Sequence, residues 1–197
     1  CDYDRFARKM RIETPPGYES LAAFNAALSD RIERLHADGA APLEQTLFGG
    51  TQSAGRLWNN DDPVIRALAT ALEGLAARYL AELPVDPSHP FLARNTGRSR
   101  LAGAWSVRLG SGGGHVDHVH PAGWVSASYY VSVPASVMAG ERAGWLRIGA
   151  PGLPGLDLPV ERYIQPEPGC AIVFPSYFWH GVEPFESDEV RVTAPFD

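Results

Sequence analysis

The stretch HVDHVHPAGWVSASYYVSV, residues 115–133, places a cluster of histidines directly before a segment in which apolar and polar residues alternate. Side chains of a β-strand point to opposite faces in turn, so the alternation predicts a strand with two different faces. One face carries Val125, Ala127, Tyr129, Val131 and Val133, and the other carries Ser126, Ser128, Tyr130 and Ser132. We expect the first face to pack in a core and the second to line a cavity or meet solvent.

Short segments of similar character lie on both sides of this strand. Further strands are predicted in AWSVRL (104–109), GWLRIG (144–149), VERYI (160–164), CAIVF (170–174) and VRVTAPF (190–196). Turns rich in glycine and proline separate them, notably APGLPGLDLP (150–159), which we expect to be a surface loop, and QPEPG (165–169). Many short strands with such turns are typical of an antiparallel sandwich or barrel.

The first hundred residues have a different periodicity. Apolar residues recur every three or four positions in residues 21–35 and again in residues 65–79, which predicts two amphipathic helices. Asp62 and Pro63 are suited to the cap and first turn of the second helix. The helices precede the strands as a block, which argues against a parallel βαβ sheet. We expect a single domain over 1–197, with a helical part and the first strands in 1–98 and a β core in 99–197.

Composition and charge exclude several classes of partner. The chain has 197 residues and a formal net charge of −6, which argues against binding to nucleic acid or to polyanionic membranes. No window approaches the roughly 18 apolar residues of a membrane span, and no secretory signal is visible at the start. Neither Cys1 nor Cys170 lies in a CxxC pair, a pattern that fits a reducing compartment. We therefore expect a cytoplasmic location.

The histidine cluster contains two pairs with metal-ligand spacing. His115 and Asp117 form an H-x-D pair, and His118 and His120 form an H-x-H pair. Within either pair, both side chains would point to the same side of an extended chain. Because the two pairs begin an odd number of residues apart, they would point to opposite sides of a regular strand. Both therefore serve together only if the chain bends between them. Of the three histidines outside this cluster, His36 and His89 each stand alone, and we expect surface or capping roles for them.

A third ligand and a cation follow later in the chain. His180 lies between two predicted strands, and Arg191 follows it by eleven residues. Two ligands from the cluster and His180 would occupy one face of a metal ion and leave the opposite face open. Such a face suits non-haem Fe(II), although the same ligands would also make a zinc site. If Arg191 lies on the adjacent antiparallel strand, its guanidinium enters the same cavity and can grip a carboxylate.

Taken together, these motifs resemble the Fe(II)/2-oxoglutarate-dependent dioxygenase superfamily. The resemblance extends through QTLFGGTQS, HPFL, WSVRL, PGCAIVFPSYFWHGVEPF and RVTAPFD. More specifically, it points to the 2-oxoglutarate oxygenase domains found behind tetratricopeptide repeats in bacterial proteins, and hence to attachment to a repeat domain in the full-length chain. It implies a double-stranded β-helix, that is, a jelly roll or cupin-like barrel, with the N-terminal α-helices packed outside it.

The resemblance also implies site residues and a reaction. His180 matches the distal metal ligand, Arg191 the residue that holds the far carboxylate of 2-oxoglutarate, and Tyr130 a tyrosine that hydrogen-bonds the same carboxylate. Closer relatives share an H-x-H-P element, which favours His118 and His120 over the alternative proximal pair. The implied cofactors are Fe(II) and the cosubstrate 2-oxoglutarate. With O₂, these hydroxylate a substrate and release succinate and CO₂.

Other functions remain open at this point. The substrate is not readable from the sequence; it is either a protein side chain or a small molecule. One alternative is a cupin-type metal-binding protein that does not depend on 2-oxoglutarate, although the glutamate expected after the second histidine of a cupin motif is absent from PAGWVSAS (121–128). A second is a non-catalytic jelly-roll binding domain. A zinc hydrolase is a weaker alternative, because no general-base glutamate lies beside the histidines.

Overall fold

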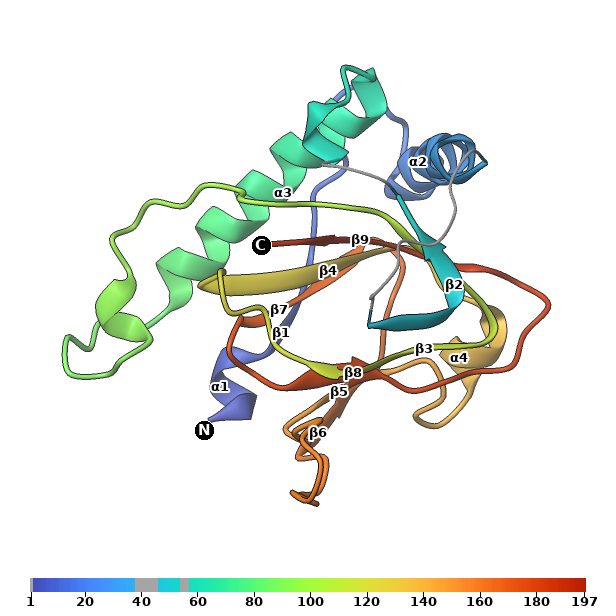
Figure 1. The fold of residues 1–197 in the computed structure, drawn as a ribbon. Coiled ribbons are helices and arrows are strands. Elements are labelled where there is room, and N and C mark those ends of the chain that lie inside the picture. The colour runs from blue at the N-terminus through green and yellow to red at the C-terminus, as the bar shows by residue number, and fades with distance from the viewer. Residues whose placement is uncertain (1, 38–45, 54–56) are drawn as a thin grey trace.

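The computed structural model describes residues 2–37, 46–53 and 57–197. The helices and 3₁₀ turns are α1 (Tyr3–Phe6), α2 (Leu21–His36), η1 (Leu57–Asn59), α3 (Pro63–Glu82), η2 (Leu92–Arg94) and α4 (Ala135–Ala139). The strands are β1 (Arg8–Arg11), β2 (Leu47–Gln52), β3 (Val107–His118), β4 (Val125–Ser132), β5 (Leu146–Ile148), β6 (Arg162–Ile164), β7 (Cys170–Pro175), β8 (His180–Val182) and β9 (Arg191–Phe196). Figure 1 shows the strands rolled around a common interior, with α2 and α3 outside.

A single antiparallel sheet forms both walls of this roll. Its strand order is β1-β7-β4-β9-β3-β8-β5-β6, and β2 also pairs with β3. The long strand β3 joins the two walls, because residues 107–109 pair with β9 while His115 and His118 pair with β8. This is the nearly closed antiparallel topology of a jelly roll, which confirms the predicted fold class (Figure 1).

Glycines allow β3 to change walls. Gly112 adopts a φ of 73°, a left-handed conformation that side chains other than glycine rarely tolerate. A Cβ on Gly113 would lie 2.8 Å from the carbonyl oxygens of both Gly49 and Gly110. The run of glycines thus provides a bend between the half of β3 that pairs with β9 and the half that enters the histidine cluster.

The two long helices cover the outside of the wall that contains β4. Ser20 caps α2 by accepting from Ala23 N, and Asp62 caps α3 with Pro63 in the first turn, as predicted. Tyr129, on the outward face of β4, donates a 2.6 Å hydrogen bond to Asn25 of α2. The apolar face of β4 therefore packs under the helices and leaves its polar face for the interior. No helix among the described residues is both long and apolar enough to cross a membrane.

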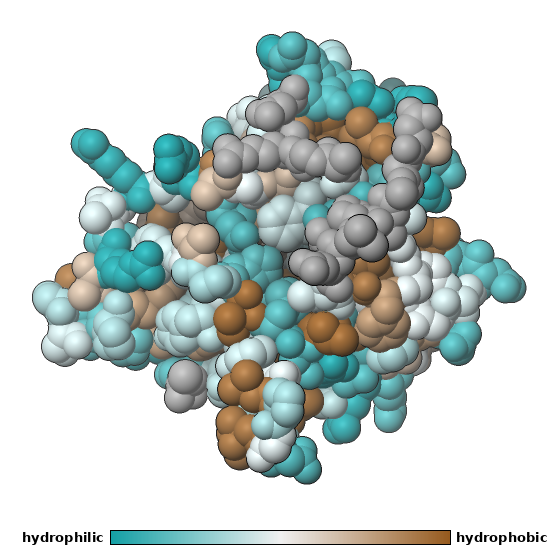
Figure 2. All heavy atoms as spheres, viewed as in Figure 1, coloured by the Kyte–Doolittle hydropathy of each residue, from teal (hydrophilic) through white to brown (hydrophobic). Residues whose placement is uncertain are grey.

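The segment between β5 and β6 is a surface loop, as predicted. It carries three leucines that are about half exposed: Leu153, Leu156 and Leu158. The loop protrudes at the lower edge of the molecule in Figure 1, and the same region contains brown, hydrophobic residues in Figure 2.

The two isolated histidines have different surroundings. His89 accepts from the backbone N–H groups of Phe91 and Leu92, which confirms the predicted capping role. The prediction of a surface or capping role is wrong for His36, which is buried between Thr51 and Ser106 at 2.7 and 2.9 Å. Burial lowers the pKa of His36, so its neutral ring joins α2 to β2 and to the segment before β3.

Candidate metal centre

A cavity of about 410 Å³ opens inside the jelly roll. Its walls come from alternate residues of several strands, as the period of two requires. On β4 these include Ser126, Ser128 and Tyr130, and on β9 they are Arg191, Thr193 and Pro195. The polar face of β4 thus lines the cavity rather than meeting bulk solvent, and Tyr130 lies on that face as the alternation predicts.

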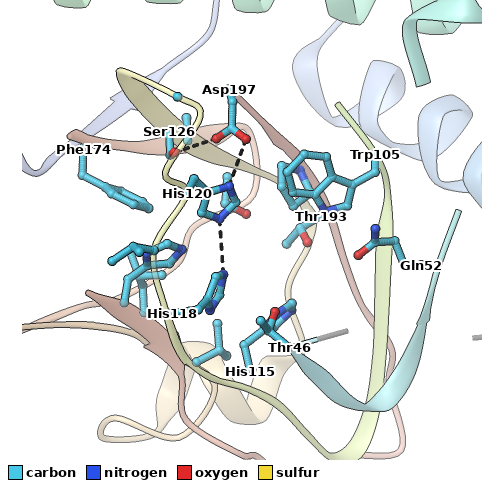
Figure 3. A pocket seen from close by; sticks show the side chains of 18 of the residues that line it. Thr46, Gln52, Trp105, His115, His118, His120, Ser126, Phe174, Thr193 and Asp197 are labelled. Carbon is cyan, nitrogen blue, oxygen red and sulfur yellow. Dashed lines mark hydrogen bonds and ion pairs between the residues drawn. The ribbon is translucent and has the colours of Figure 1, made fainter. Parts of the chain in front are cut away.

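Three histidines meet at one end of this cavity. His118 ends β3, His120 follows it in the turn, and His180 begins β8, which pairs with β3 so that His118 and His180 lie directly opposite each other. One ring nitrogen of each lies within 4.8 Å of the other two. Figure 3 shows His118 and His120 pointing toward one another across a gap of 3.2 Å between their Nε2 atoms.

Hydrogen bonds at Nδ1 fix which nitrogen of each ring is free. Nδ1 of His118 lies 2.8 Å from the carbonyl oxygen of Val116, and Nδ1 of His180 lies 2.9 Å from that of Phe178. A carbonyl only accepts, so both Nδ1 atoms carry the proton. Nδ1 of His120 contacts the carboxylate of Asp197 at 2.9 Å and donates in the same way. All three Nε2 atoms then present lone pairs to one another, an arrangement that a bound cation would stabilise.

Burial keeps two of these rings neutral. It lowers the pKa of His118 and lowers that of His180 well below its ordinary value, because a charged ring would lose its hydration. A metal ion requires the unprotonated nitrogen, so neither ring has to release a proton from Nε2 at neutral pH before it binds.

The side chains of the alternative pair, His115 and Asp117, point in different directions. His115 lines the cavity, with its ring 6.0 Å from that of His118. Asp117 is turned away and makes a two-pronged ion pair with Arg147 at 2.8 and 3.1 Å. The expectation that His115 points opposite to His118 is wrong, because the register with β8 shifts between these residues and adds one residue to β3.

Arg191 and Tyr130 lie deep in the same cavity. Arg191 is 2% exposed, and among the described residues no carboxylate forms an ion pair with it. Its guanidinium lies 5.0 Å from the ring centre of Tyr130, and both the Tyr130 hydroxyl and the Arg191 Nε lack a hydrogen-bond partner within the described part of the chain. Burial lowers the pKa of Arg191 and raises that of Tyr130. A buried, unpaired cation is costly, so the pair is suited to an anionic ligand.

Two neighbours of His120 were not identified as site residues from the sequence. Asp197 holds its Nδ1 as described, and no spacing motif connects residues 77 positions apart. Trp105 stacks on the ring with centroids 5.8 Å apart and planes within 10°. The sequence indicates a place for Asp197 in the cavity only through the period of two along β9, which continues from Arg191, Thr193 and Pro195 to Asp197.

Comparison with known proteins agrees with this geometry. Residues 103–197 match the model of a family described as "Putative 2OG-Fe(II) oxygenase". The match contains the three clustered histidines, Tyr130 and Arg191. No curated protein matches the sequence.

Solved structures share the fold over nearly the whole chain. A Pseudomonas putida prolyl-4-hydroxylase matches with a TM-score of 0.60 at 16% identity, over 99% of this chain and 93% of that one. A Trichoplax adhaerens prolyl hydroxylase, solved in complex with a hypoxia inducible factor peptide fragment, gives 0.61 at 14% identity, over 98% and 82%.

A third similar structure contains bound ligands. HygX from Streptomyces hygroscopicus, solved with nickel, 2-oxoglutarate and hygromycin B, has a TM-score of 0.61 at 15% identity, over 98% of this chain and 83% of that one. At these identities the solved structures establish the shared fold. The family match covers residues 103–197, slightly less than half of the chain, and shows that this part is similar to a family of oxygenases that use Fe(II) and 2-oxoglutarate.

Proposed function

We propose that the chain is an oxygenase that uses Fe(II) and 2-oxoglutarate, and that His118, His120 and His180 hold its Fe(II) as a face of three histidines. The observation that carries the proposal is the convergence of three Nε2 atoms whose rings are each fixed by a hydrogen bond at Nδ1. Asp117 is unsuited to the role because Arg147 occupies both of its oxygens. His115 lies in the cavity but outside the group of three, so we assign it to the wall of the site.

Arg191 and Tyr130 are proposed to bind the far carboxylate of 2-oxoglutarate. The guanidinium can form two parallel hydrogen bonds with a carboxylate, and the unpartnered Tyr130 hydroxyl can donate a third. The ligand would also neutralise a buried cation that has no ionic partner among the described residues. The buried Arg191 favours 2-oxoglutarate over a metal-dependent activity without it, because the guanidinium is suited to bind a carboxylate.

The chain's own residues then position the reactants and limit access of water. When bound, Fe(II) with 2-oxoglutarate and O₂ supplies the oxidising chemistry, in which succinate and CO₂ are released and an oxygen atom enters the substrate. Arg191 and Tyr130 would hold one end of the cosubstrate, and the three histidines would hold the metal ion to which its other end binds. Phe174 packs against His180, with ring centres 4.6 Å apart, and makes that side of the site apolar. We propose hydroxylation as the outcome, on a protein side chain or a small molecule.

The wider setting is also a proposal. The resemblance to oxygenase domains that accompany tetratricopeptide repeats supports a single catalytic domain over 1–197, attached to such repeats in the full-length chain. Cys170 is a buried free thiol, which fits a reducing cytoplasm. The net charge of −6 argues against a nucleic-acid or membrane partner.

Anaerobic titration tests this function directly. Addition of Fe(II) and then 2-oxoglutarate should produce a weak visible charge-transfer band. Arg191→Met should weaken 2-oxoglutarate binding by about 100-fold or more, since it removes a charged bidentate contact, while Fe(II) binding persists. Arg108→Met is the matched control, because Arg108 lies on β3 beside β9 and pairs with Glu33 at the surface. Equal loss in both variants, or Fe(II) binding without any band in the native protein, would contradict the proposal.

A further inference from the structure

We propose that Asp197 is a positioning residue of the metal centre, which acts through His120 and provides the negative charge that a three-histidine face lacks. The inference rests on the proposed ligand set of His118, His120 and His180. It concerns a residue outside that set, and the argument comes from the contacts of its carboxylate.

The carboxylate of Asp197 is held at both oxygens. Oδ2 accepts from Nδ1 of His120 at 2.9 Å, and Oδ1 accepts from the Ser126 hydroxyl (Figure 3). Ser126 is buried, and its oxygen lies 2.9 Å from the Ser176 hydroxyl. The backbone carbonyl of Ser176 in turn accepts from His120 N at 3.0 Å. Four groups from three parts of the chain therefore form one closed network around the His120 ring.

The backbone also fixes Asp197 in place. Its N–H donates to the carbonyl of Gly103 at 3.0 Å, and its own carbonyl accepts from Ala102 N at 2.7 Å. On the other side of His120, Trp105 stacks on the ring within 10° of parallel. The indole thus fixes the plane of the imidazole ring, and the carboxylate fixes the direction of its Nδ1. The Nε2 atom on the other side of the ring therefore stays directed at the other two histidines.

His120 differs from the other two histidines in the charge of its partner. His118 and His180 donate from Nδ1 to neutral backbone carbonyls, whereas His120 donates to a carboxylate. Three neutral imidazoles leave a divalent cation uncompensated, and Asp117 is neutralised by Arg147. Asp197 therefore places one negative charge a single ring away from the metal position. A carboxylate in this place makes the imidazole a stronger donor and favours the higher oxidation state of a bound ion.

A substitution that removes the charge of Asp197 but keeps the shape of its side chain tests the proposal. Asp197→Asn keeps the shape of the side chain and one acceptor oxygen for His120 Nδ1, while its NH₂ group can donate to the Ser126 hydroxyl, and the negative charge is removed. We expect Fe(II) to bind about tenfold or more weakly, within the 10–100-fold range typical of such partners, and the Fe(III)/Fe(II) potential to rise. Ser126→Ala should shift both quantities in the same direction by less, because it frees one oxygen of the carboxylate. Asp117→Asn is the matched control, and we expect it to change neither the affinity nor the potential.

The outcomes separate this inference from the proposed ligand set. If the native protein and Asp117→Asn bind Fe(II) but Asp197→Asn matches them in both affinity and potential, the inference is wrong and the ligand set stands. If Asp197→Asn loses binding as completely as His120→Ala does, Asp197 is a direct ligand and the inference is also wrong. A native protein that binds no Fe(II) would overturn the ligand set itself. Should Asp197→Asn not fold, Ser126→Ala decides the matter through the potential, which a purely structural role would not move.

Discussion

Two adjacent triplets of β3 and the following turn have opposite surroundings. In His115-Val116-Asp117 the histidine lines the cavity, while the carboxylate faces outward and is neutralised by Arg147. In His118-Val119-His120 both histidines face inward and meet His180. The two triplets have similar composition and the same spacing, so residue type alone does not decide which pair faces a common point.

The difference arises from a local irregularity in the strand. His115 pairs with Val182 and His118 pairs with His180, so three steps along β3 match two steps along β8. The extra residue turns Asp117 outward and returns His118 to the inner face that His115 occupies. A β-bulge of one residue therefore changes an apparent 2-His-1-carboxylate motif into a three-histidine face.

The largest expected effect separates the two triplets by metal affinity. His118→Ala should weaken Fe(II) binding by more than about 100-fold, because loss of a direct ligand exceeds the effect typical of an outer partner. Asp117→Ala should leave the affinity unchanged, since both of its oxygens face Arg147. Anaerobic equilibrium titration with Fe(II) measures both. The reverse result would show that the H-x-D triplet holds the metal and that the bulge is not retained in solution.

The sequence predicted the parts of the site that depend on strand periodicity. Alternation placed Tyr130 on the polar face of the strand, which lines the cavity, and Tyr129 on the opposite face. The expectation that Arg191 enters the cavity of His180 depended on its strand, and Arg191 does line that cavity. The phase of His115 was predicted wrongly, because a bulge depends on the partner strand and leaves no mark in the local pattern.

Contacts between distant parts of the chain explain the rest. Asp197 meets His120 only once β9 lies in the sheet, and no local rule connects them. His36 has the sequence surroundings of a helix end, yet its ring is buried because Thr51 and Ser106 provide partners from elsewhere in the fold. The helices were predicted correctly because caps and apolar periodicity are properties of a single segment.

A second effect distinguishes the triplets by stability. Asp117→Ala leaves Arg147, whose side chain is 17% exposed, with Glu183 at 3.3 Å as its only ionic partner among the described residues. We expect the free energy of unfolding to fall by about 2 kcal/mol, the size typical of a partly buried hydrogen-bonded ion pair. Chemical denaturation measures the change. Asp61→Ala, which breaks an exposed pair with Arg66, should cost less than about 0.5 kcal/mol. Similar losses in the two variants would mean that the Asp117 pair is solvated and free to move.

The smallest expected effect concerns the bend that precedes both triplets. Gly112 has a φ of 73°, and no heavy atom of the described residues lies within 4 Å of where a Cβ would be, so Gly112→Ala adds backbone strain without a clash. We expect a loss of about 1 kcal/mol in the free energy of unfolding, measured by chemical denaturation. Gly74→Ala, at an exposed and equally open position within α3, should instead gain about 0.5–1 kcal/mol. Fe(II) affinity should stay unchanged in both variants, because the cross-strand pairs of His115 and His118 fix the triplets after the bend. A fall in affinity for Gly112→Ala alone would show that the bend, rather than pairing with β8, sets the direction of the histidines.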